Sequence, residues 1–337
     1  MTGAGAPGAA GILHCLGQEP ALKVTVADAS ENSVGRYLAN DFVKIPRGDD
    51  PAFVPVLLDL CRDRDIQILM PLVTKELIPL ALHKESFAAA GTKILVSDAP
   101  SLEIANNKSR LYQFLEWRGI EVPAYRVVEN TEQFRQALHE LGYPGKPVCF
   151  KPSVSNGSRG VRILREDISE SALLFQQKPG HLWMRAAEAL RILEEAPFPE
   201  LLVSEYLPGD EYSVDCLCYQ GEARLIVPRL RRKMVNGITV EGVFEEKEEI
   251  INYSRRIIAE LKLHGNIGIQ VKQAAVGNYL LLEINPRVQG TISAALGAGV
   301  NLPLLAVRQE AGFPVEENDL RVKWGTRFSR YWQEVFY

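Results

Sequence analysis

The chain has 337 residues, of which 46% are hydrophobic and 24% charged, so it is long enough for two or more globular domains. A formal net charge of −4 argues against a general nucleic-acid binder, and no apolar run approaches the roughly 20 residues of a membrane helix. Five scattered cysteines form no C-x-x-C pair, and the N-terminus lacks a secretory signal pattern, so we expect a cytoplasmic protein.

The first hundred residues alternate between strand-like and helix-like segments. Strand patterns cover residues 22–28, 66–71 and 93–96, and helical patterns cover residues 51–64 and 77–90. Short parallel strands joined by helices are typical of a right-handed α/β layer. We therefore predict such a layer at the start of the chain.

A glycine-rich turn opens this layer. Gly3, Gly5 and Gly8 form a G-x-G-x-x-G pattern, and Asp28 follows Gly8 by 20 residues. This spacing is typical of dinucleotide binding, in which the glycines admit a pyrophosphate and the acid holds a ribose. It keeps an NAD(P)-dependent oxidoreductase open as an alternative, although any tight strand–helix turn favours glycine. Only two residues precede the turn, so we expect that either the first strand is cut short or the start of the sequence is assigned late.

The rest of the chain combines helices with a strand-rich second half. Helices are predicted at 107–117, 131–141 and 246–263, and a largely helical stretch at 167–196 is interrupted near Pro179 and Gly180. Strands are predicted at 148–151 and 161–164, which form a hairpin, and repeatedly from residue 201 onward. Strands grouped in this way indicate an antiparallel sheet, so this part is α+β.

Lys151 stands at the base of a candidate phosphate-binding loop. It ends the predicted strand at 148–151, and residues 153–160 that follow are mostly small and polar, with Arg159 among them. Such a loop can turn backbone N–H groups toward phosphates while the lysine supplies a point charge. A polar hairpin loop with a lysine that reaches solvent is the plainer interpretation.

Glu283 and Asn285 end an apolar strand and are followed by Arg287. Residues at i and i+2 of a strand point to one face, so the carboxylate and the carboxamide would aim two oxygen ligands at one point. Oxygen donors suit Mg²⁺, which also binds phosphate oxygens, and the arginine could hold an anion beside it. The alternative is a buried strand that ends in a polar turn.

Two further groups carry polar residues at strand spacing. The segment from Glu205 to Leu207 could present its backbone to an adenine edge, and Glu211 could bind ribose hydroxyls, or this strand could simply have a solvated acidic face. A basic run at 229–233 places Arg229 and Arg231 on one strand face, where they could bind a substrate anion or be solvated.

In order along the chain, these segments resemble the ATP-grasp superfamily, and they look most like the ATP-binding half of the carbamoyl-phosphate synthetase large subunit and its single-copy relatives. The resemblance rests on residues 107–108, 150–152 with the following loop, 204–207, 209–215, Gln270 and 283–287. It implies a Rossmann-like pre-ATP-grasp domain followed by a two-lobed ATP-grasp fold. The implied domains are 1–100, then 101–312 with a lid lobe at about 122–204 and a catalytic lobe at about 205–312, then a tail at 313–337 that packs on the body.

The resemblance also implies a role for each matching residue. Catalytic roles fall to Arg287 and Lys151, and Mg²⁺ (or Mn²⁺) would be held by Gln270, Glu283 and Asn285. ATP would be bound by Lys108, Lys151, Ser158, Gly160, Glu205, Tyr206, Leu207 and Glu211. The implied activity is ATP-dependent ligation, in which a substrate carboxylate is activated as an acyl phosphate and attacked by an amine. We expect small-molecule carboxylate and amine substrates and a homodimer, with no nucleic-acid or membrane partner. A non-catalytic ATP-binding scaffold stays open as a third interpretation.

Overall fold

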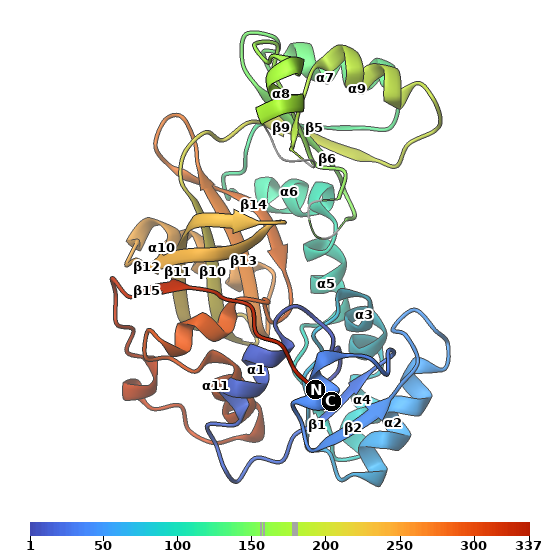
Figure 1. The fold of residues 1–337 in the computed structure, drawn as a ribbon, viewed down its shortest axis with the longest axis vertical. Coiled ribbons are helices and arrows are strands. Elements are labelled where there is room, and N and C mark those ends of the chain that lie inside the picture. The colour runs from blue at the N-terminus through green and yellow to red at the C-terminus, as the bar shows by residue number, and fades with distance from the viewer. Residues whose placement is uncertain (156, 158, 177–180) are drawn as a thin grey trace. The chain divides into compact units, whose positions relative to one another are not determined.

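The computed structural model describes residues 1–155, 157, 159–176 and 181–337. The chain forms two compact units. Unit 1 comprises Met1–Ala105, Asp210–Val271 and Leu282–Tyr337, and unit 2 comprises Asn106–Gly209 and Lys272–Leu281. Both units mix helices and strands (Figure 1). The domain limits expected from the sequence stay a prediction.

Unit 1 begins with a parallel α/β layer. β1 (Thr25–Asp28) pairs with β2 (Asp41–Lys44), and β3 (Ile68–Leu69) pairs with β4 (Lys93–Ile94). Thr2 forms single parallel bridges to Ala27 and Pro71, so this residue alone stands where a central strand would lie. The helices are α1 (Ala9–Leu16), the 3₁₀ helix η1 (Val34–Tyr37), α2 (Phe53–Asp63), α3 (Thr74–Leu82), α4 (Lys84–Ala89) and α5 (Ala99–Ala105).

The helix predicted at residues 77–90 is in fact two helices. α3 ends at Leu82 and α4 begins at Lys84, because His83 between them has a φ of −114° that leaves the helical range. The apolar faces of α2, α3 and α4 meet in one buried core around Phe53, Leu77 and Phe87. The helical pattern therefore located this segment, while the local backbone divided it into two helices.

A six-stranded sheet forms the second part of unit 1. Its strand order is β14-β13-β10-β11-β12-β15, and β10–β11, β11–β12 and β12–β15 are antiparallel. The strands are β10 (Glu211–Tyr219), β11 (Glu222–Val235), β12 (Ile238–Phe244), β13 (Gly265–Gln273), β14 (Tyr279–Asn285) and β15 (Arg327–Ser329). The tips of β13 and β14 continue into unit 2. β11 runs 14 residues and β12 follows a two-residue turn, so the basic run predicted at 229–233 is the middle of a long hairpin.

The glycine-turn helix and the C-terminal helices cover one core of unit 1. The helices are α10 (Glu248–Glu260), the 3₁₀ helix η2 (Ile292–Leu296), α11 (Leu302–Ala311) and the 3₁₀ helix η3 (Glu317–Leu320). Leu217, Val227 and Phe244 from the sheet meet α1, η2 and α11 in a single buried cluster. Figure 1 shows α1 and α11 beside each other below the sheet. No described helix is long and apolar enough to cross a membrane.

Unit 2 holds a five-stranded sheet with the order β5-β9-β6-β7-β8. The strands are β5 (Tyr125–Val128), β6 (Val148–Pro152), β7 (Arg162–Leu164), β8 (Trp183–Met184) and β9 (Leu201–Glu205). The helices are α6 (Lys108–Trp117), α7 (Thr131–Glu140), α8 (Glu170–Gln176) and α9 (Ala186–Leu193). Figure 1 shows α7 and α9 over the same sheet, where their apolar residues and those of β6 and β9 form the core.

The stretch at 167–196 is less helical than predicted. Between α8 and α9, Trp183 and Met184 pair in parallel with Ile163 and Leu164 on β7 and add a fifth strand. An aromatic side chain fits a half-buried sheet surface, and this tertiary pairing overrides the helical pattern around it. The predicted interruption near Pro179 and Gly180 lies outside the described residues. The hairpin predicted between 148–151 and 161–164 is confirmed as the β6–β7 pair.

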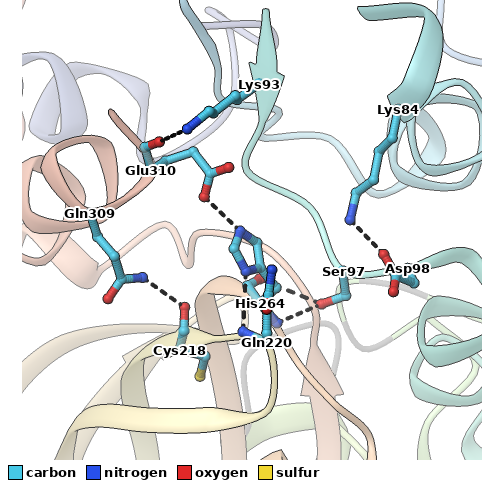
Figure 2. Close-up of polar contacts among 9 residues, drawn as sticks. All are labelled: Lys84, Lys93, Ser97, Asp98, Cys218, Gln220, His264, Gln309 and Glu310. Atoms are coloured by element: carbon cyan, nitrogen blue, oxygen red, sulfur yellow. Dashed lines mark hydrogen bonds and ion pairs between the residues drawn. The ribbon is translucent and has the colours of Figure 1, made fainter. Parts of the chain in front are cut away.

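His264 joins the sheet of unit 1 to its helical layers, as Figure 2 shows. The backbone N–H of Gln220 donates to Nδ1 (3.3 Å), so Nε2 carries the proton that is shared with the Glu310 carboxylate (2.8 Å). The backbone N–H of His264 donates to Ser97 Oγ (2.9 Å). These bonds connect the β10–β11 turn, α11 and the segment after β4.

The C-terminal segment contacts unit 1 at two places. β15 extends the sheet edge, where Phe328 packs against the core, and Tyr337 stacks on Tyr37 with ring centroids 3.8 Å apart. The side chains of Tyr331, Trp332 and Phe336 are almost fully exposed.

Candidate active site

Unit 2 brings Lys108 to the loop that follows β6. Lys108 is the first residue of α6, which Asn107 caps by accepting from the backbone N–H of Arg110 (3.0 Å). The Lys108 backbone N–H donates to Ser153 O and its Nζ donates to Ser155 O, both at 2.8 Å. Lys108 is only 5% exposed. The structure therefore holds a buried cation against the loop that the sequence singled out.

Lys151 lies on the polar face of the unit 2 sheet, which we define by Cys149 and Lys151. Val148 and Phe150 enter the apolar core, so the alternate residues of β6 point the other way. Lys151 is 7% exposed, and its Nζ lies 5.5 Å from the centroid of the Tyr112 ring. Burial raises the pKa of the Cys149 thiol, while Lys151 and Lys272 both oppose this shift. Both ammonium groups therefore act on the same thiol.

The linker segment 205–207 is anchored through Glu205. Its backbone N–H donates to Ala124 O (2.9 Å), and its Oε1 accepts from the Ala124 N–H (2.8 Å). The Tyr206 ring packs near edge-on against Trp183, with centroids 5.8 Å apart, and Leu207 is buried. The carboxylate is thus held by β5, while the tyrosine turns toward the polar face.

Gly160 closes the predicted phosphate loop onto its own strand. Its φ of +74° favours glycine, and a side chain there would meet the Pro152 ring at 2.7 Å. The other predicted loop ligand, Ser158, lies outside the described residues.

Lys272 and Trp183 are polar-face residues that the sequence interpretation missed. The Lys272 Nζ lies 4.8 Å from the centroid of the Tyr206 ring. In register, Cys149 pairs with Ile163, and Ile163 pairs with Trp183, so Trp183 shares the polar face. Lys272 stands two residues after Gln270 on one strand, so the period-2 spacing could have revealed it. Nothing in the sequence could reveal Trp183, because its strand forms only through tertiary pairing.

The predicted metal ligands lie in unit 1 on two neighbouring strands. Gln270 is on β13, and Glu283 and Asn285 are on β14. All three are partly exposed, and they offer one carboxylate and two amide oxygens. Among the described residues, no group of three or more His, Cys, Asp or Glu could hold a metal. The donor set is therefore suited to a hard cation that keeps water and phosphate oxygens as further ligands.

Arg287 is held beside these ligands by neutral groups. Its Nε donates to Thr74 Oγ1 (3.2 Å), Nη1 donates to Val288 O (2.9 Å), and Nη2 donates to Asn285 Oδ1 (3.4 Å). Burial lowers the pKa of Arg287, and the Glu283 carboxylate opposes this shift. The guanidinium is thus fixed in place next to the oxygen donors.

Arg229 and Arg231 of the basic run are occupied by internal partners. Arg229 and Asp215 are both fully buried, with Nε and Oδ2 3.2 Å apart. The proposal that Arg229 binds a substrate anion is therefore wrong, because its guanidinium is enclosed in the core. Arg231 pairs with Glu211 and donates to Thr239 Oγ1 (3.0 Å). The ribose-binding role of Glu211 stays a prediction, and this carboxylate has an arginine partner.

The glycine turn packs against the chain itself and is closed by hydrogen bonds to Asp28. The Gly5 N–H donates to Asp28 Oδ2 (2.7 Å), and the Ser30 N–H donates to Asp28 Oδ1 (2.8 Å). A side chain at Gly8 would come within 2.5 Å of the Gly290 backbone. Because Asp28 is engaged and Gly8 touches the chain itself, this geometry does not favour a dinucleotide at the turn.

Two family models match parts of the chain. Residues 197–328 match the family model described as ATP-grasp in the biosynthetic pathway with Ter operon, and residues 10–95 match the PylC-like N-terminal domain. Both matches bear out the resemblance to ATP-grasp proteins, and the predicted fold, an α/β first domain followed by an ATP-grasp fold, is confirmed.

The chain is similar in sequence to carbamoyl phosphate synthase large chains. The carbamoyl phosphate synthase large chain of Methanothermobacter thermautotrophicus is 27% identical over 238 residues, which are 67% of this chain and 21% of that protein. The chain thus spans about a fifth of the length of that relative.

Solved structures align over nearly the whole chain. An ADP complex of purK, N5-carboxyaminoimidazole ribonucleotide synthetase, has a TM-score of 0.70 at 20% identity and covers 93% of this chain and 76% of that one. The biotin carboxylase domain of Hydrogenobacter thermophilus 2-oxoglutarate carboxylase has a TM-score of 0.67 at 15% identity and covers 95% and 71%. At these identities the likeness establishes the fold.

Proposed function

We propose that this chain is an ATP-dependent ligase that activates a substrate carboxylate as an acyl phosphate and joins it to an amine. The match to the ATP-grasp family model supports ATP as the cosubstrate. The purK structure is an ADP complex, and the biotin carboxylase structure contains ADP with magnesium. The predicted domain limits, the cytoplasmic location and the homodimer belong to the same proposal.

The observation that carries the proposal is the burial of two lysines, Lys108 and Lys151, at one strand–loop junction. A buried ammonium group loses its hydration, which costs free energy that a structural role seldom requires. Lys108 contacts the loop after β6, and Lys151 is the residue before the last of that strand. Two such cations beside a loop of small residues suit the oxygens of a polyphosphate.

The acid–amide set in unit 1 supports the metal part of the proposal. Gln270, Glu283 and Asn285 would hold Mg²⁺, which would supply charge neutralisation at the transferred phosphoryl group when bound with the nucleotide. Arg287 would hold the anionic substrate or the phosphoryl oxygens, since it is fixed by three hydrogen bonds and stays charged. Mn²⁺ stays a prediction from the sequence.

The proposed reaction has two balanced steps. A substrate carboxylate oxygen attacks the γ-phosphorus of ATP, the bond to the β–γ bridging oxygen breaks, and ADP leaves. The amine then attacks the carbonyl carbon of the acyl phosphate, phosphate leaves, and the amine gives up its proton. Each cation placed about 4 Å from a developing phosphoryl charge contributes roughly 4 kcal/mol at an effective dielectric near 20.

The test is ADP release from the full chain with Mg·ATP and pooled carboxylic acids and amines. A responsive pool should be found, and Glu283→Gln should lower its ADP release by at least 100-fold with the melting temperature unchanged. Glu222→Gln is the matched control, because this exposed carboxylate pairs with Arg224 on its own strand and with no other residue that the structure describes. ATP binding without ADP release in any pool would favour the scaffold interpretation. Stabilisation by NADH instead of ATP would favour the oxidoreductase.

A further inference from the structure

A second hollow lies wholly within unit 1, apart from the candidate active site. Its volume is about 630 Å³. Five chain segments line it: the start of α4, β4 with Asp98, the β10–β11 turn, the end of α10 with His264, and α11. The small apolar residues Ala88, Ile94 and Ala259 lie among charged ones. Gln220 lines the hollow and follows the end of β10, whereas Glu211, a predicted ATP-binding residue, begins that strand. Nine residues of strand separate these two ends by roughly 27 Å.

Three lysines line this hollow, and two of them make no ion pair among the described residues. Lys84 pairs with Asp98 (2.7 Å), and the carboxylate of Glu310 is bound by His264 (Figure 2). Lys93 donates only to the neutral backbone oxygen of Glu310 (2.9 Å). The side chain of Lys262 makes no hydrogen bond or ion pair within the described chain. It does lie near Asp98, whose pKa is lowered mainly by Lys84 and further by His264 and Lys262.

Lys262 has a backbone conformation that favours glycine, although a lysine stands there. Lys262 follows α10 with a φ of +48°, the left-handed conformation that glycine adopts without strain at this position after a helix. The Leu263 N–H donates to Ile258 O (3.1 Å), which closes the helix end around it. The fold alone would therefore be served better by glycine. An exposed lysine in this backbone conformation, whose side chain makes no hydrogen bond or ion pair in the described chain, is available to an anionic ligand.

The surroundings of Lys262 are rigid. A side chain at Gly221 would meet the Lys262 Cα at 3.1 Å, so the β10–β11 turn lies directly on this backbone. On the other side of the turn, His264 is fixed by Gln220, Ser97 and Glu310. The backbone that carries Lys262 is therefore already fixed before a ligand binds, which lowers the entropic cost of binding.

We propose that this hollow is a binding site for a small organic polyanion, whose carboxylate or phosphate groups are held by Lys93 and Lys262. The ammonium groups of Lys93 and Lys262 make no ion pair in the described chain and come from different elements, so they fit a ligand with at least two anionic groups. The volume admits a molecule much larger than a single phosphate ion. The site is separate from the proposed catalytic residues, and its occupancy would link the α/β layer to the six-stranded sheet through His264 and Glu310.

Isothermal titration of the full chain with citrate and with pyrophosphate, at constant ionic strength, tests the proposal. At least one of these two probes should bind with millimolar or better affinity, while acetate should not. The stronger of the two identifies the anionic group that the site prefers. Lys262→Gly should weaken binding by at least tenfold while the melting temperature stays the same or rises, because glycine relieves the backbone strain. Lys93→Met should weaken binding similarly, and Lys23→Met, at an exposed lysine elsewhere in unit 1, should not.

A parallel titration of Lys151→Met separates this site from the proposed phosphate site. Binding that survives Lys151→Met and is lost in Lys262→Gly supports the proposal, whether or not the chain proves to be a ligase. Binding that is lost in Lys151→Met and kept in Lys262→Gly would overturn it. Failure of both probes to bind, or equal binding by all lysine variants, would overturn it as well.

Discussion

Replacing Glu76 with Gln should stabilise the protein above neutral pH and leave its stability unchanged in acid. The Glu76 side chain is buried beneath the α/β layer, with 5% of the residue exposed, and its Oε2 accepts from Thr2 Oγ1 (2.6 Å). Burial is the main cause that raises the pKa of this carboxyl from 4.5 to about 7, although the Thr2 hydrogen bond opposes it. A glutamine can accept the same hydrogen bond without a charge.

The magnitude follows from the two pKa values. The folded state binds the proton more tightly than the unfolded state, so stability is highest below pH 4.5 and falls as the pH rises toward about 7. Ionising the buried carboxyl costs about 1.4 kcal/mol for each unit by which its pKa is raised, or about 3 kcal/mol in all. Above pH 7 the full cost is present, and Glu76→Gln removes it.

Urea unfolding of both proteins from pH 4 to 8 measures this difference. Groups remote from Glu76 titrate equally in the two proteins, so the difference between their unfolding free energies reports on Glu76 together with the Met1 ammonium that interacts with it. It should be small near pH 4, grow between pH 4.5 and 7, and level off at about 3 kcal/mol. A difference that stays flat over this range, or that grows toward acid, would refute the assignment of a buried carboxyl with a raised pKa.

Three further predictions concern the polar face, the core and the glycine turn. If nucleotide occupies the polar face, Mg·ATP should quench the fluorescence of Trp183, and Trp183→Phe should abolish that quenching; unchanged quenching in this variant would contradict the placement. Arg229→Met should destabilise the chain by about 3–5 kcal/mol, because it leaves the Asp215 carboxyl buried without its partner. Adding Asp215→Asn should restore most of the lost stability, and equal unfolding midpoints for the single and double variants would argue against this. Gly8→Ala should cost about 1–3 kcal/mol in thermal unfolding, since its methyl group would overlap a neighbouring backbone, while Gly297→Ala should cost less; the reverse order would be inconsistent with the packing.

The sequence alone was sufficient for the class of fold and for most helices and strands. The apolar run of residues 279–282 with the alternating residues after it, and the period-3.6 patterns of α6, α7 and α10, are local in sequence, and these elements form as predicted. Motif order was sufficient for the ATP-grasp superfamily, because several short segments in fixed succession are far more specific than any one of them. The roles of Lys108, Lys151, Glu283 and the other predicted site residues stay predictions.

Only the tertiary structure decided how charged side chains are used. Arg229 and Arg231 look like a solvated or substrate-binding run in sequence, yet partners 14 and 20 residues away on β10 neutralise them. Trp183 became part of a sheet because β7 pairs with it, and Lys262 became notable because its backbone is left-handed and its side chain makes no hydrogen bond or ion pair in the described chain. Burial, pairing and backbone strain depend on residues that are distant in sequence, so local spacing does not encode them.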